Sequence, residues 1–518
     1  MNHAHGTAAR LCLTITIVAG LVLFAPLRAP AATFTVDSTL DGPDQVTDGV
    51  CATALGVCTL RAAIQEANAT AGPTMDSIHF DIPQSDSGCD GNDICVVEIA
   101  ALLPDILSPT TIDGSTQPGN ADVCTLPIAA RPPYRIVLDG ESGLVGLRPE
   151  LGSDGSVIRG LNIRRFSDAV ALIQTHSSRV ECSFIGTDET GMTAIANSRN
   201  GVILGCDADF NIVGGPDPGD GNLLSGNAID GVQMYGDIPC PALGEPDDNL
   251  VQGNIIGIAK DGVTPLGNTF AGVSVFGDTR YPDDNVIDGN LIGANSSAGV
   301  FVGDRVDGTI IRANIIGTDG GGTVPLPNLD GVYSEGDPGT RIGGLDDGEG
   351  NVIAFNTLAG VAIGDFTNPG MGNRIQRNSI YGNGDVGIDL GADGATPNDP
   401  GDADAGANGL QNFPDITEVA LGPASFDVTY SVDSTLPLTV EFFSAEAGQG
   451  RTFLTDEVYN GGSSTASLPI VPGVHSIVAT ATDAAGNTSE FSPPAAVPPI
   501  FSDGFESGDT SAWSVTVP

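Results

Sequence analysis

Apolar and polar residues alternate over short stretches of this chain, and one such pattern returns seven times between Ser178 and Gly382. The copies begin at Ser178, Asn222, Asn249, Asn285, Thr309, Asn351 and Asn373. In every copy the third and the eighth residues are apolar, as in Val251 and Ile256. This spacing predicts two short strands that face a common core.

The sixth residue of the pattern is asparagine in six copies and Ser183 in the other. Asparagine tolerates a left-handed backbone and bonds locally, so we expect a bend between the two strands. A second phrase follows, such as GVSVFGD from Gly272 or GVFVGD from Gly299, and predicts a third strand that ends in a turn. Short repeats at roughly 20 to 27 residues per coil predict an all-β chain wound into a parallel β-helix.

Residues 1–31 have the features of a signal peptide, because Arg10 precedes an apolar run and Ala29-Pro30-Ala31 offers small residues for cleavage. The run is too short for a stable membrane span, and we expect no transmembrane segment in the mature chain. We therefore expect a secreted or cell-surface protein, exported through a cleaved N-terminal signal peptide.

Residues 32–75 are expected to form an N-terminal cap. TFTVDST from Thr33 predicts a strand, and CTLRAAIQEANA from Cys58 predicts a helix with Leu60 and Ile64 on one face. The open end of a β-helix exposes unpaired backbone groups that would recruit another strand. We expect the helix to cover that end.

Residues 58–63 read CTLRAA, which resembles the motif of the CSLREA-motif family of exported bacterial proteins, with threonine for serine and Ala-Ala where the family has Glu-Ala. Residues 110–119 and 378–414 resemble the same family. The resemblance implies a right-handed parallel β-helix, which we place at residues 76–412. It brings no catalytic residue with it.

The pattern changes after residue 412 to alternating strands such as SFDVTYSV and LTVEFFSA. Turn residues at about every tenth position predict a small antiparallel β-sandwich over residues 413–494. Its last stretch resembles the final hairpin of bacterial immunoglobulin-like domains. Residues 495–518 read as a linker and a tail with the single tryptophan, Trp513, and the tail resembles a sorting signal of exported proteobacterial proteins. A disordered tail is the alternative.

Acidic side chains dominate the composition, with 65 Asp and Glu against 19 Lys and Arg, and the net charge is −46. This charge repels phosphate backbones, so nucleic acid is excluded as a partner. Cations and neutral glycans fit better, although a solvated secreted surface also explains the acidity. We expect a monomer that meets an extracellular glycan or another cell-surface ligand.

Eight of the nine cysteines lie beyond the signal segment, an even number that suits disulfides in an oxidising compartment. The expected local pairs are Cys51–Cys58 and Cys89–Cys95. The other four cysteines allow three pairings. We favour Cys206–Cys240, because both follow GV strands of successive coils, and this choice leaves Cys124–Cys182.

Oxygen ligands crowd a Gly-rich loop, NDPGDADAGANG from Asn398. The candidate ligands for a hard cation, calcium above all, are Asp399, Asp402, Asp404 and Asn408. The alternative is a polar linker. A second set of aspartates follows the GV strands, and we expect these on one edge, where calcium or salt would offset their repulsion. They are Asp237, Asp278, Asp304, Asp337 and Asp365.

No catalytic residue is assigned from the sequence. Asp247-Asp248 and Asp283-Asp284 both precede the asparagine that begins a copy, so their shared position indicates turn residues. Arg164-Arg165 are expected to close the exposed side of a strand. An enzyme would need one coil that breaks the repeat with a convergent acid and base. We therefore favour noncatalytic recognition, either adhesion or carbohydrate binding, over the alternative of a polysaccharide lyase or glycoside hydrolase.

Three insertions of similar sequence begin at Ile185, Ile256 and Ile316 and run from Ile-Gly to an asparagine. Loops that leave the same strand in different coils would stack on one side of the solenoid. They are expected either to form a binding surface or to be repeat decoration.

Overall fold

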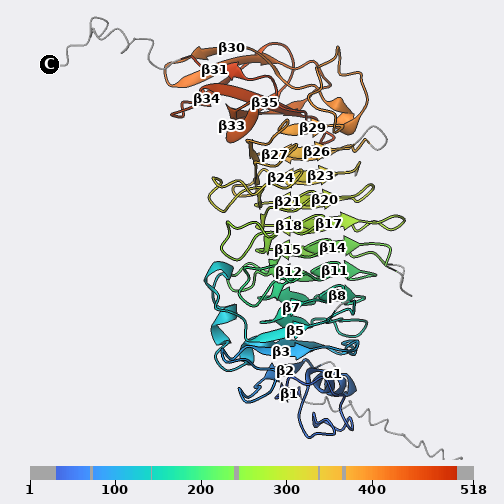
Figure 1. The fold of residues 1–518 in the computed structure, drawn as a ribbon. Helices are drawn as coiled ribbons and strands as arrows, with labels where there is room; N and C mark the ends of the chain where they lie inside the picture. The colour runs from blue at the N-terminus through green and yellow to red at the C-terminus, as the bar shows by residue number, and fades with distance from the viewer. Residues whose placement is uncertain are drawn as a thin grey trace, which may run out of the picture.

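The computed structural model describes residues 31–70, 74–141, 143–238, 244–336, 339–364 and 369–498. The expected signal peptide up to residue 30 and the expected tail from residue 499 lie outside these residues. The described chain forms a right-handed parallel β-helix followed by a smaller antiparallel unit, which confirms the predicted fold class. Figure 1 shows the coils stacked in sequence order between the N-terminal helix and the antiparallel strands.

Three parallel sheets form the walls of the β-helix. The first sheet contains β1 (Thr33–Val36), β2 (Asp76–Phe80), β4 (Thr110–Asp113), β6 (Val157–Arg159), β9 (Arg179–Glu181), β12 (Ile212–Gly214), β15 (Leu250–Gln252), β18 (Val286–Asp288), β21 (Ile310–Arg312), β24 (Arg341–Gly343) and β27 (Arg374–Gln376). The second contains β3 (Cys95–Glu98), β5 (Ile136–Asp139), β7 (Asn162–Arg164), β10 (Phe184–Ile185), β13 (Leu223–Leu224), β16 (Ile255–Ile256), β19 (Leu291–Ile292), β22 (Ile315–Ile316), β25 (Val352–Ala354) and β28 (Ser379–Tyr381). The third contains β8 (Val170–Ile173), β11 (Val202–Gly205), β14 (Val232–Tyr235), β17 (Val273–Phe276), β20 (Val300–Val302), β23 (Val332–Ser334), β26 (Val361–Ile363) and β29 (Ile388–Leu390).

Apolar wall positions of the repeat fill the core. Val251, Ile287 and Ile311 lie side by side in successive strands of the first sheet, and all three are fully buried. Ile256 and Ile292 do the same in the second sheet. Full burial of one such side chain stabilises the fold by about 1.5 to 3 kcal/mol, so the stack of coils supplies the main driving force for folding.

Asparagines at the corners form hydrogen-bonded ladders and do not take the left-handed backbone that we expected of them. The residue before the sixth position of each copy has that backbone instead, as at Gly253 (φ 70°) and Ala313 (φ 55°). The Oδ1 atom of Asn254 accepts hydrogen bonds from the N and Nδ2 atoms of Asn222, at 2.9 and 3.0 Å. The bend is present, and the asparagine stabilises it through a buried amide whose donors and acceptor form hydrogen bonds.

One ladder runs between the first and second sheets and another between the second and third. The first comprises Asn222, Asn254, Asn290, Asn314, Asn351 and Asn378. The second comprises Asn197, Asn227, Asn268, Asn295, Asn328, Asn356 and Asn383. Because β13 pairs with β16 and β25 with β22, the copies that begin at Asn222 and Asn351 are shifted. Their first asparagine occupies the corner that the sixth asparagine occupies elsewhere.

Helix α1 (Leu60–Ala69) covers the N-terminal end of the stack, as predicted (Figure 1). Thr59 caps the helix, because its side chain accepts a hydrogen bond from the backbone N of Ala62. Leu60 and Ile64 are 0% and 1% exposed and belong to the main core. Four short 3-10 helices interrupt the loops elsewhere in the described part of the chain. They are η1 (Gly114–Thr116), η2 (Ala121–Cys124), η3 (Ile128–Ala130) and η4 (Ala407–Leu410).

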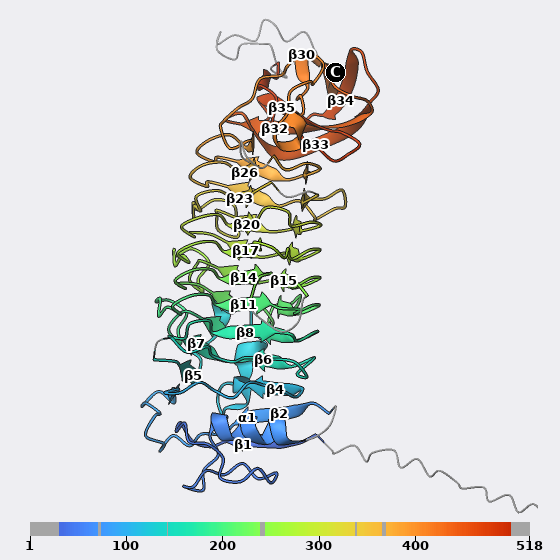
Figure 2. The same cartoon turned by 90° about the vertical axis from the view of Figure 1, so that its right-hand side faces the viewer.

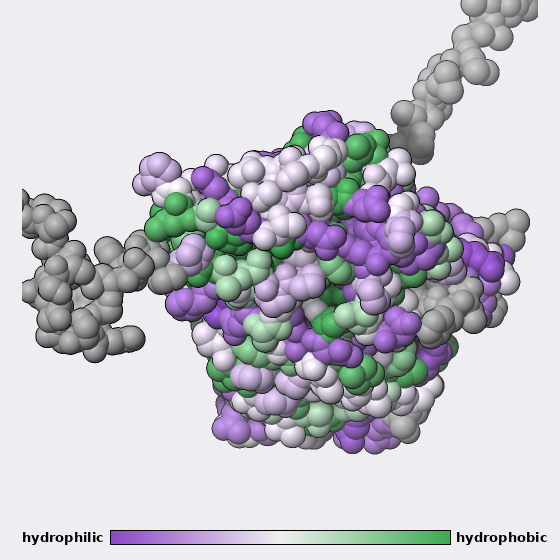
Figure 3. Space-filling view, turned by 90° about the horizontal axis from the view of Figure 1, so that it is seen from above, coloured by the Kyte–Doolittle hydropathy of each residue, from purple (hydrophilic) through white to green (hydrophobic). Residues whose placement is uncertain are grey.

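The antiparallel unit consists of two sheets around its own core. One contains β30 (Asp415–Leu421), β31 (Ser425–Ser431) and β34 (Ser464–Pro469), and the other contains β32 (Leu438–Glu446), β33 (Gln449–Tyr459), β35 (Ser476–Thr482) and β36 (Ala495–Ala496). β36 pairs with β35, so the region where we expected a linker to begin at residue 495 is still part of a sheet. Seen from its outer end, the unit shows hydrophobic groups interspersed among hydrophilic ones (Figure 3).

This unit covers the last coil of the β-helix through side chains that take the place of a further coil. The Oε1 atom of Gln449 accepts from the N and Nδ2 atoms of Asn383, at 3.0 and 3.1 Å, and so continues the second asparagine ladder. Thr488 accepts at Oγ1 from the backbone N of Ile375 at 3.0 Å. Polar atoms at the end of the stack are therefore satisfied by the antiparallel unit.

Disulfides join Cys51–Cys58, Cys89–Cys95 and Cys124–Cys182, which are three of the four pairs expected from the sequence. Cys206 is also disulfide-bonded, and its expected partner, Cys240, lies outside the described residues. Bonds of this kind fit an oxidising compartment. Among the described residues, no helix is both long and apolar enough to cross a membrane.

Candidate functional site

The third sheet carries aromatic side chains on its outer face. Tyr235, Phe276, Phe301 and Tyr333 come from the successive strands β14, β17, β20 and β23, and we name this row the aromatic ladder. These strands lie one above another in Figure 2. Side chains alternate between the two faces of a strand, so Val300 and Val302 point into the core while Phe301 points outward.

The aromatic ladder places one ring on each coil, and its row shifts by two residues between Phe276 and Phe301, because Phe301 pairs with Ser274. The ring centroids are 4.9 Å apart for Tyr235 and Phe276, and 5.9 Å apart both for Phe276 and Phe301 and for Phe301 and Tyr333. Phe270 lies beside the row, 5.7 Å from Phe301, and is 38% exposed. The tilted and edge-on contacts are those that aromatic rings prefer. The result is a continuous, partly exposed aromatic surface along the solenoid axis.

Aspartates at the ends of these strands border the aromatic ladder, but they do not form a bare row of like charges. The carboxylate of Asp237 accepts a hydrogen bond from the backbone N of Thr279 at 2.8 Å. Burial acts to raise the pKa of Asp237, but this and similar hydrogen bonds outweigh burial and lower the pKa. Asp278 accepts the hydroxyl of Tyr235 at 3.0 Å, and Asp304 pairs with the arginine that follows it. Local donors therefore stabilise the charged carboxylates of the expected edge. Asp337 and Asp365 lie outside the described residues.

A buried carboxylate lies where the strand β14 begins. Asp230 has 0% exposure and accepts hydrogen bonds from the backbone N of Ala271, Ser274 Oγ and Gln233 Nε2, at 2.9, 2.8 and 2.9 Å. Burial raises its pKa to about 6, although these hydrogen bonds counteract part of the rise. A side chain closed off from solvent cannot contact a ligand, so Asp230 supports the strands beneath the aromatic ladder.

A second acidic row occupies the corner between the third and first sheets. The backbone N of Asp283 donates to Asp247 at 2.8 Å, and that of Asp247 donates to Asp209 at 3.1 Å. Burial, followed by repulsion from Asp209 and Asp283, raises the pKa of Asp247 to about 6. Asp248 and Asp284, which come next in the chain, have φ of 55° and 54°, as expected of turn residues. These pairs are therefore corner residues with structural hydrogen bonds.

The expected cation site is present only in part. Ligand oxygens of Asp399, Asp402 and Asp404 lie within 4.8 Å of one another and could hold a metal ion. Burial and repulsion from the other two carboxylates raise the pKa of Asp404. Asn408, the fourth expected ligand, makes other contacts. It is 1% exposed, its Oδ1 accepts from the backbone N of Asn373 at 2.9 Å, and its Nδ2 donates to the Asn373 carbonyl at 2.8 Å.

Most arginines that could have served a lyase are held in ion pairs. Arg312 pairs with Glu349 at 3.1 Å, and Arg377 pairs with Asp456 at 3.3 Å across the junction with the antiparallel unit. Arg164 and Arg165 share the buried Asp139.

The three insertions leave the same corner, after β10, β16 and β22, and each is closed by an antiparallel bridge. The backbone N of Lys260 in one insertion donates to the carbonyl of Gly191 in another, at 3.0 Å. These two insertions therefore stack, as expected.

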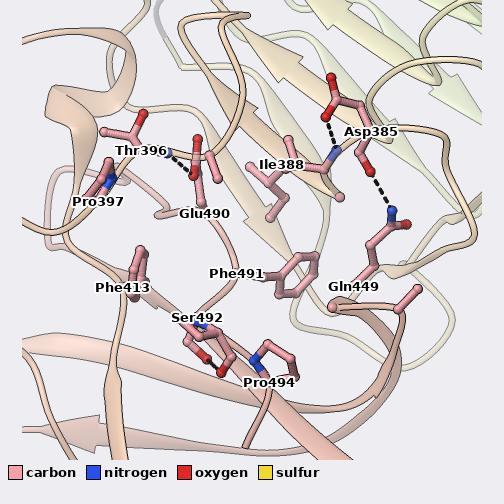
Figure 4. A pocket seen from close by; sticks show the side chains of 16 residues that line it. Asp385, Ile388, Thr396, Pro397, Phe413, Gln449, Glu490, Phe491, Ser492 and Pro494 are labelled. Carbon is pink, nitrogen blue, oxygen red and sulfur yellow. Dashed lines mark hydrogen bonds between the residues drawn. The ribbon is translucent and has the colours of Figure 1, made fainter.

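A hollow of about 420 Å³ lies where the last coil meets the antiparallel unit (Figure 4). Its polar groups serve the junction, because Glu490 accepts from the backbone N of Leu390 at 3.0 Å and from that of Thr396 at 2.8 Å. Gln449 donates to the carbonyl of Asp385 at 2.8 Å. Burial raises the pKa of Glu490 to about 7. We interpret this hollow as part of the joint.

No family model matches the chain, and no curated protein matches it. Solved structures similar to it include the A-module of the mannuronan C-5 epimerase AlgE6 from Azotobacter vinelandii, with 15% identity over 64% of this chain and 83% of that one and a TM-score of 0.38. The pectate lyase Pel9A has 12% identity over 68% of this chain and 80% of its own, with a TM-score of 0.34. An alginate lyase from Paenibacillus sp. strain FPU-7 has 15% identity, covers 69% of this chain and 98% of its own, and has a TM-score of 0.29.

Likenesses of this strength assign no activity to the chain. Membership of the CSLREA-motif family and the immunoglobulin-like character of the antiparallel unit remain predictions.

The sequence analysis missed the aromatic ladder, although the sequence contains a signal for it. In the GV phrases, Tyr235 and Phe276 are each the fifth residue, and Phe301 and Tyr333 are each the third, so all four fall on one face of a strand.

Proposed function

We propose that this protein binds an extracellular glycan through the aromatic ladder and does not cleave it. The ladder itself carries the proposal, because it is a partly exposed row of rings with one step per coil. Aromatic faces pack against the apolar faces of sugar rings, and a linear glycan laid along the axis would meet one ring after another. The aspartates on its border favour a ligand without negative charge.

A glycan array with the full chain tests the proposal. Phe301→Ala with Tyr333→Ala should weaken binding by about tenfold or more, because truncating central aromatic anchors removes the largest contacts. Phe210→Ala is the matched control, since Phe210 is 57% exposed but lies outside the ladder. Equal binding by the double variant and the wild type would refute the site.

The alternative, a polysaccharide lyase or hydrolase, needs a separate readout. Reducing ends and unsaturated products should be measured on the same polysaccharides that the array identifies. We expect neither product above the background of a boiled sample. Turnover that survives repurification would overturn the noncatalytic reading.

Export and calcium belong to the same proposal. The disulfides support a secreted or surface-attached protein, which we expect to be a monomer. Asp399, Asp402 and Asp404 would hold calcium between the coils and the antiparallel unit. Millimolar calcium should then raise the midpoint of thermal unfolding more than magnesium at equal ionic strength. Asp402→Asn with Asp404→Asn should remove the difference. Equal responses to both salts would leave only screening.

A further inference from the structure

The coil that contains β7 has no ladder asparagine at the corner between the second and third sheets. In four later coils a residue of positive φ directly precedes the ladder asparagine at this corner, as in Gly226-Asn227 and Gly382-Asn383. The coil that contains β7 has Arg165, with φ 60°, and then Phe166. The backbone N of Phe166 donates to Asn197 Oδ1 at 3.0 Å, so Phe166 occupies the position of a ladder asparagine.

Charged side chains converge at this corner. Glu98, Asp139 and Arg164 end β3, β5 and β7 and lie in register. The carboxylate of Asp139 has 0% exposure and accepts hydrogen bonds from Nε of Arg164, at 3.0 Å, and from Nε of Arg165. Arg164 also pairs with Glu189 at 3.2 Å. The two guanidinium groups are thus held by a buried acid on rigid strand ends, which fixes their positions.

Two hollows meet at Arg165. One, of about 580 Å³, is lined by Ser87, Glu98 and Arg164 among others, and the second, of about 360 Å³, by Glu141, Phe166 and Ser198. Both reach Arg165, whose side chain is 48% exposed. The hydrogen bond to Asp139, and then the charges of Asp139, Glu141 and Glu98, raise the pKa of Arg165, so the acids lie close to the guanidinium.

Donors and acceptors alternate around these hollows. Among the described residues, Arg165 donates only through Nε, so its Nη groups are available, and Glu98 has no hydrogen-bond partner. Each sugar hydroxyl both donates and accepts, so neighbouring hydroxyls can donate to a glutamate and accept from the guanidinium. The acids at the corner outnumber the two arginines, which disfavours an anion, and the guanidinium disfavours an ammonium group.

We propose that this Arg165 corner is a second ligand site, which binds an uncharged sugar residue through adjacent hydroxyl groups. It lies at the level of β7, whereas the aromatic ladder begins at β14 on a different sheet, so the two sites can be tested separately. The aromatic ladder takes a long chain, and this corner takes one or two sugar units between Glu98, Arg165 and Glu141.

The test uses the full chain with maltotriose, cellotriose and laminaritriose as neutral probes, and trigalacturonate and a glucosamine trimer as charged ones. Saturation-transfer NMR detects binding and isothermal titration calorimetry measures affinity. Arg165→Gly should weaken neutral trisaccharide binding about tenfold, the effect of one charge-assisted hydrogen bond. Glycine suits this backbone, because Gly226 and Gly382 have φ of 76° and 66° at the same corner, so the fold should be retained.

Arg341→Gln serves as the control, because Arg341 is exposed on β24 in the first sheet. Glu98→Gln is a second variant that leaves Arg165 and the fold unchanged, and it should also weaken binding. The double variant Phe301→Ala with Tyr333→Ala should bind the trisaccharides as the wild type does, even if it loses long glycans. Any of three results would overturn the inference: no neutral trisaccharide binds, a charged probe binds more tightly, or Arg165→Gly and Glu98→Gln bind unchanged.

Discussion

Single asparagines set the geometry of the corners. The amide of Asn290 accepts from Asn254, donates to the carbonyl of Val251 at 2.9 Å and donates to Asn314 Oδ1 at 3.0 Å. A buried amide in such a chain serves both neighbouring coils at once. Aspartate could accept but not donate, and leucine could do neither. Asparagine is thus required by the two-sided hydrogen bonding of each coil.

Asn290→Ala should therefore lower the free energy of unfolding by about 2 to 4 kcal/mol, because it leaves buried groups on two coils without partners. Urea unfolding followed by circular dichroism measures the change. Asn460→Ala is the control, since Asn460 is exposed in the antiparallel unit and should change stability by no more than about 0.5 kcal/mol. Similar losses for both variants would show that the ladder contributes nothing special.

Buried carboxyls give the protein an unusual pH dependence. Burial raises the pKa of Asp230 and Asp247 to about 6 and that of Glu441 and Glu490 to about 7. The folded state binds these protons more tightly than the unfolded chain, so their stabilising contribution is complete below about pH 4 and is lost as the pH rises through 6 and 7. The midpoint of thermal unfolding should be higher near pH 5 than near pH 8.

Glu441→Gln with Glu490→Gln should reduce this difference, because amides do not ionise. Glu418→Gln, on the exposed strand β30, should leave it unchanged. A midpoint that rises from pH 5 to pH 8 would contradict the assignment.

Individual strands of the solenoid contain two to five residues and cannot be stable alone, so each element depends on the coils beside it. This dependence explains what the sequence could predict. Val251 and Ile256 recur at fixed places, which predicts the strands, and Leu60 with Ile64 predicts helix α1. The register between coils was harder to predict. In the copies from Asn222 and Asn351, the first and sixth asparagines lie at a different pair of corners from the one used in the other copies.

Sites were less predictable than elements for a physical reason. The sequence does not distinguish a loop carboxylate or amide that binds a cation from one that binds the backbone. Asn408 was therefore expected to be a ligand, whereas its amide binds the backbone of Asn373. Arg165 was expected to close the exposed side of a strand. Its contact with the buried Asp139 could not be predicted, because Asp139 is buried only when β5 and β7 are in register. Such contacts between coils are long-range in the sequence and leave no local pattern.

Helix α1 offers a test at the scale of one element. Ile64→Asp places a charge in the core beside β1 and β2 and should expose the first coil, which would then associate with other chains. Light scattering should report oligomers. Leu55→Asp changes a leucine that is 75% exposed in the same cap and should stay monomeric. Monomeric behaviour of Ile64→Asp at wild-type stability would show that the helix is not needed as a cap.

The whole molecule is a rod closed at both ends, with α1 at one pole and the antiparallel unit at the other (Figure 1). Truncation after Pro414 should leave the edges of β27, β28 and β29 uncovered, and the shortened chain should form oligomers at micromolar concentration. Gln449→Ala should cause a smaller effect, a loss of about 1 to 3 kcal/mol from one unpaired ladder end. Size-exclusion chromatography with light scattering measures the association of the truncated chain, and urea unfolding measures the loss of stability in the Gln449→Ala variant. A monomeric, fully folded truncation would show that the last coil needs no cover.

The junction at Gln449 has a consequence for how this protein can change over evolutionary time. Asn383 donates to Gln449 at 3.0 and 3.1 Å, and Asn356 donates to Asn383 at 3.0 and 2.9 Å, so the cap meets the last coil with the geometry by which one coil meets the next. The cap recognises a generic coil surface and not one particular coil. Duplication or loss of a whole coil within the gene would therefore leave both junctions intact, and rods of different reach could arise in single steps.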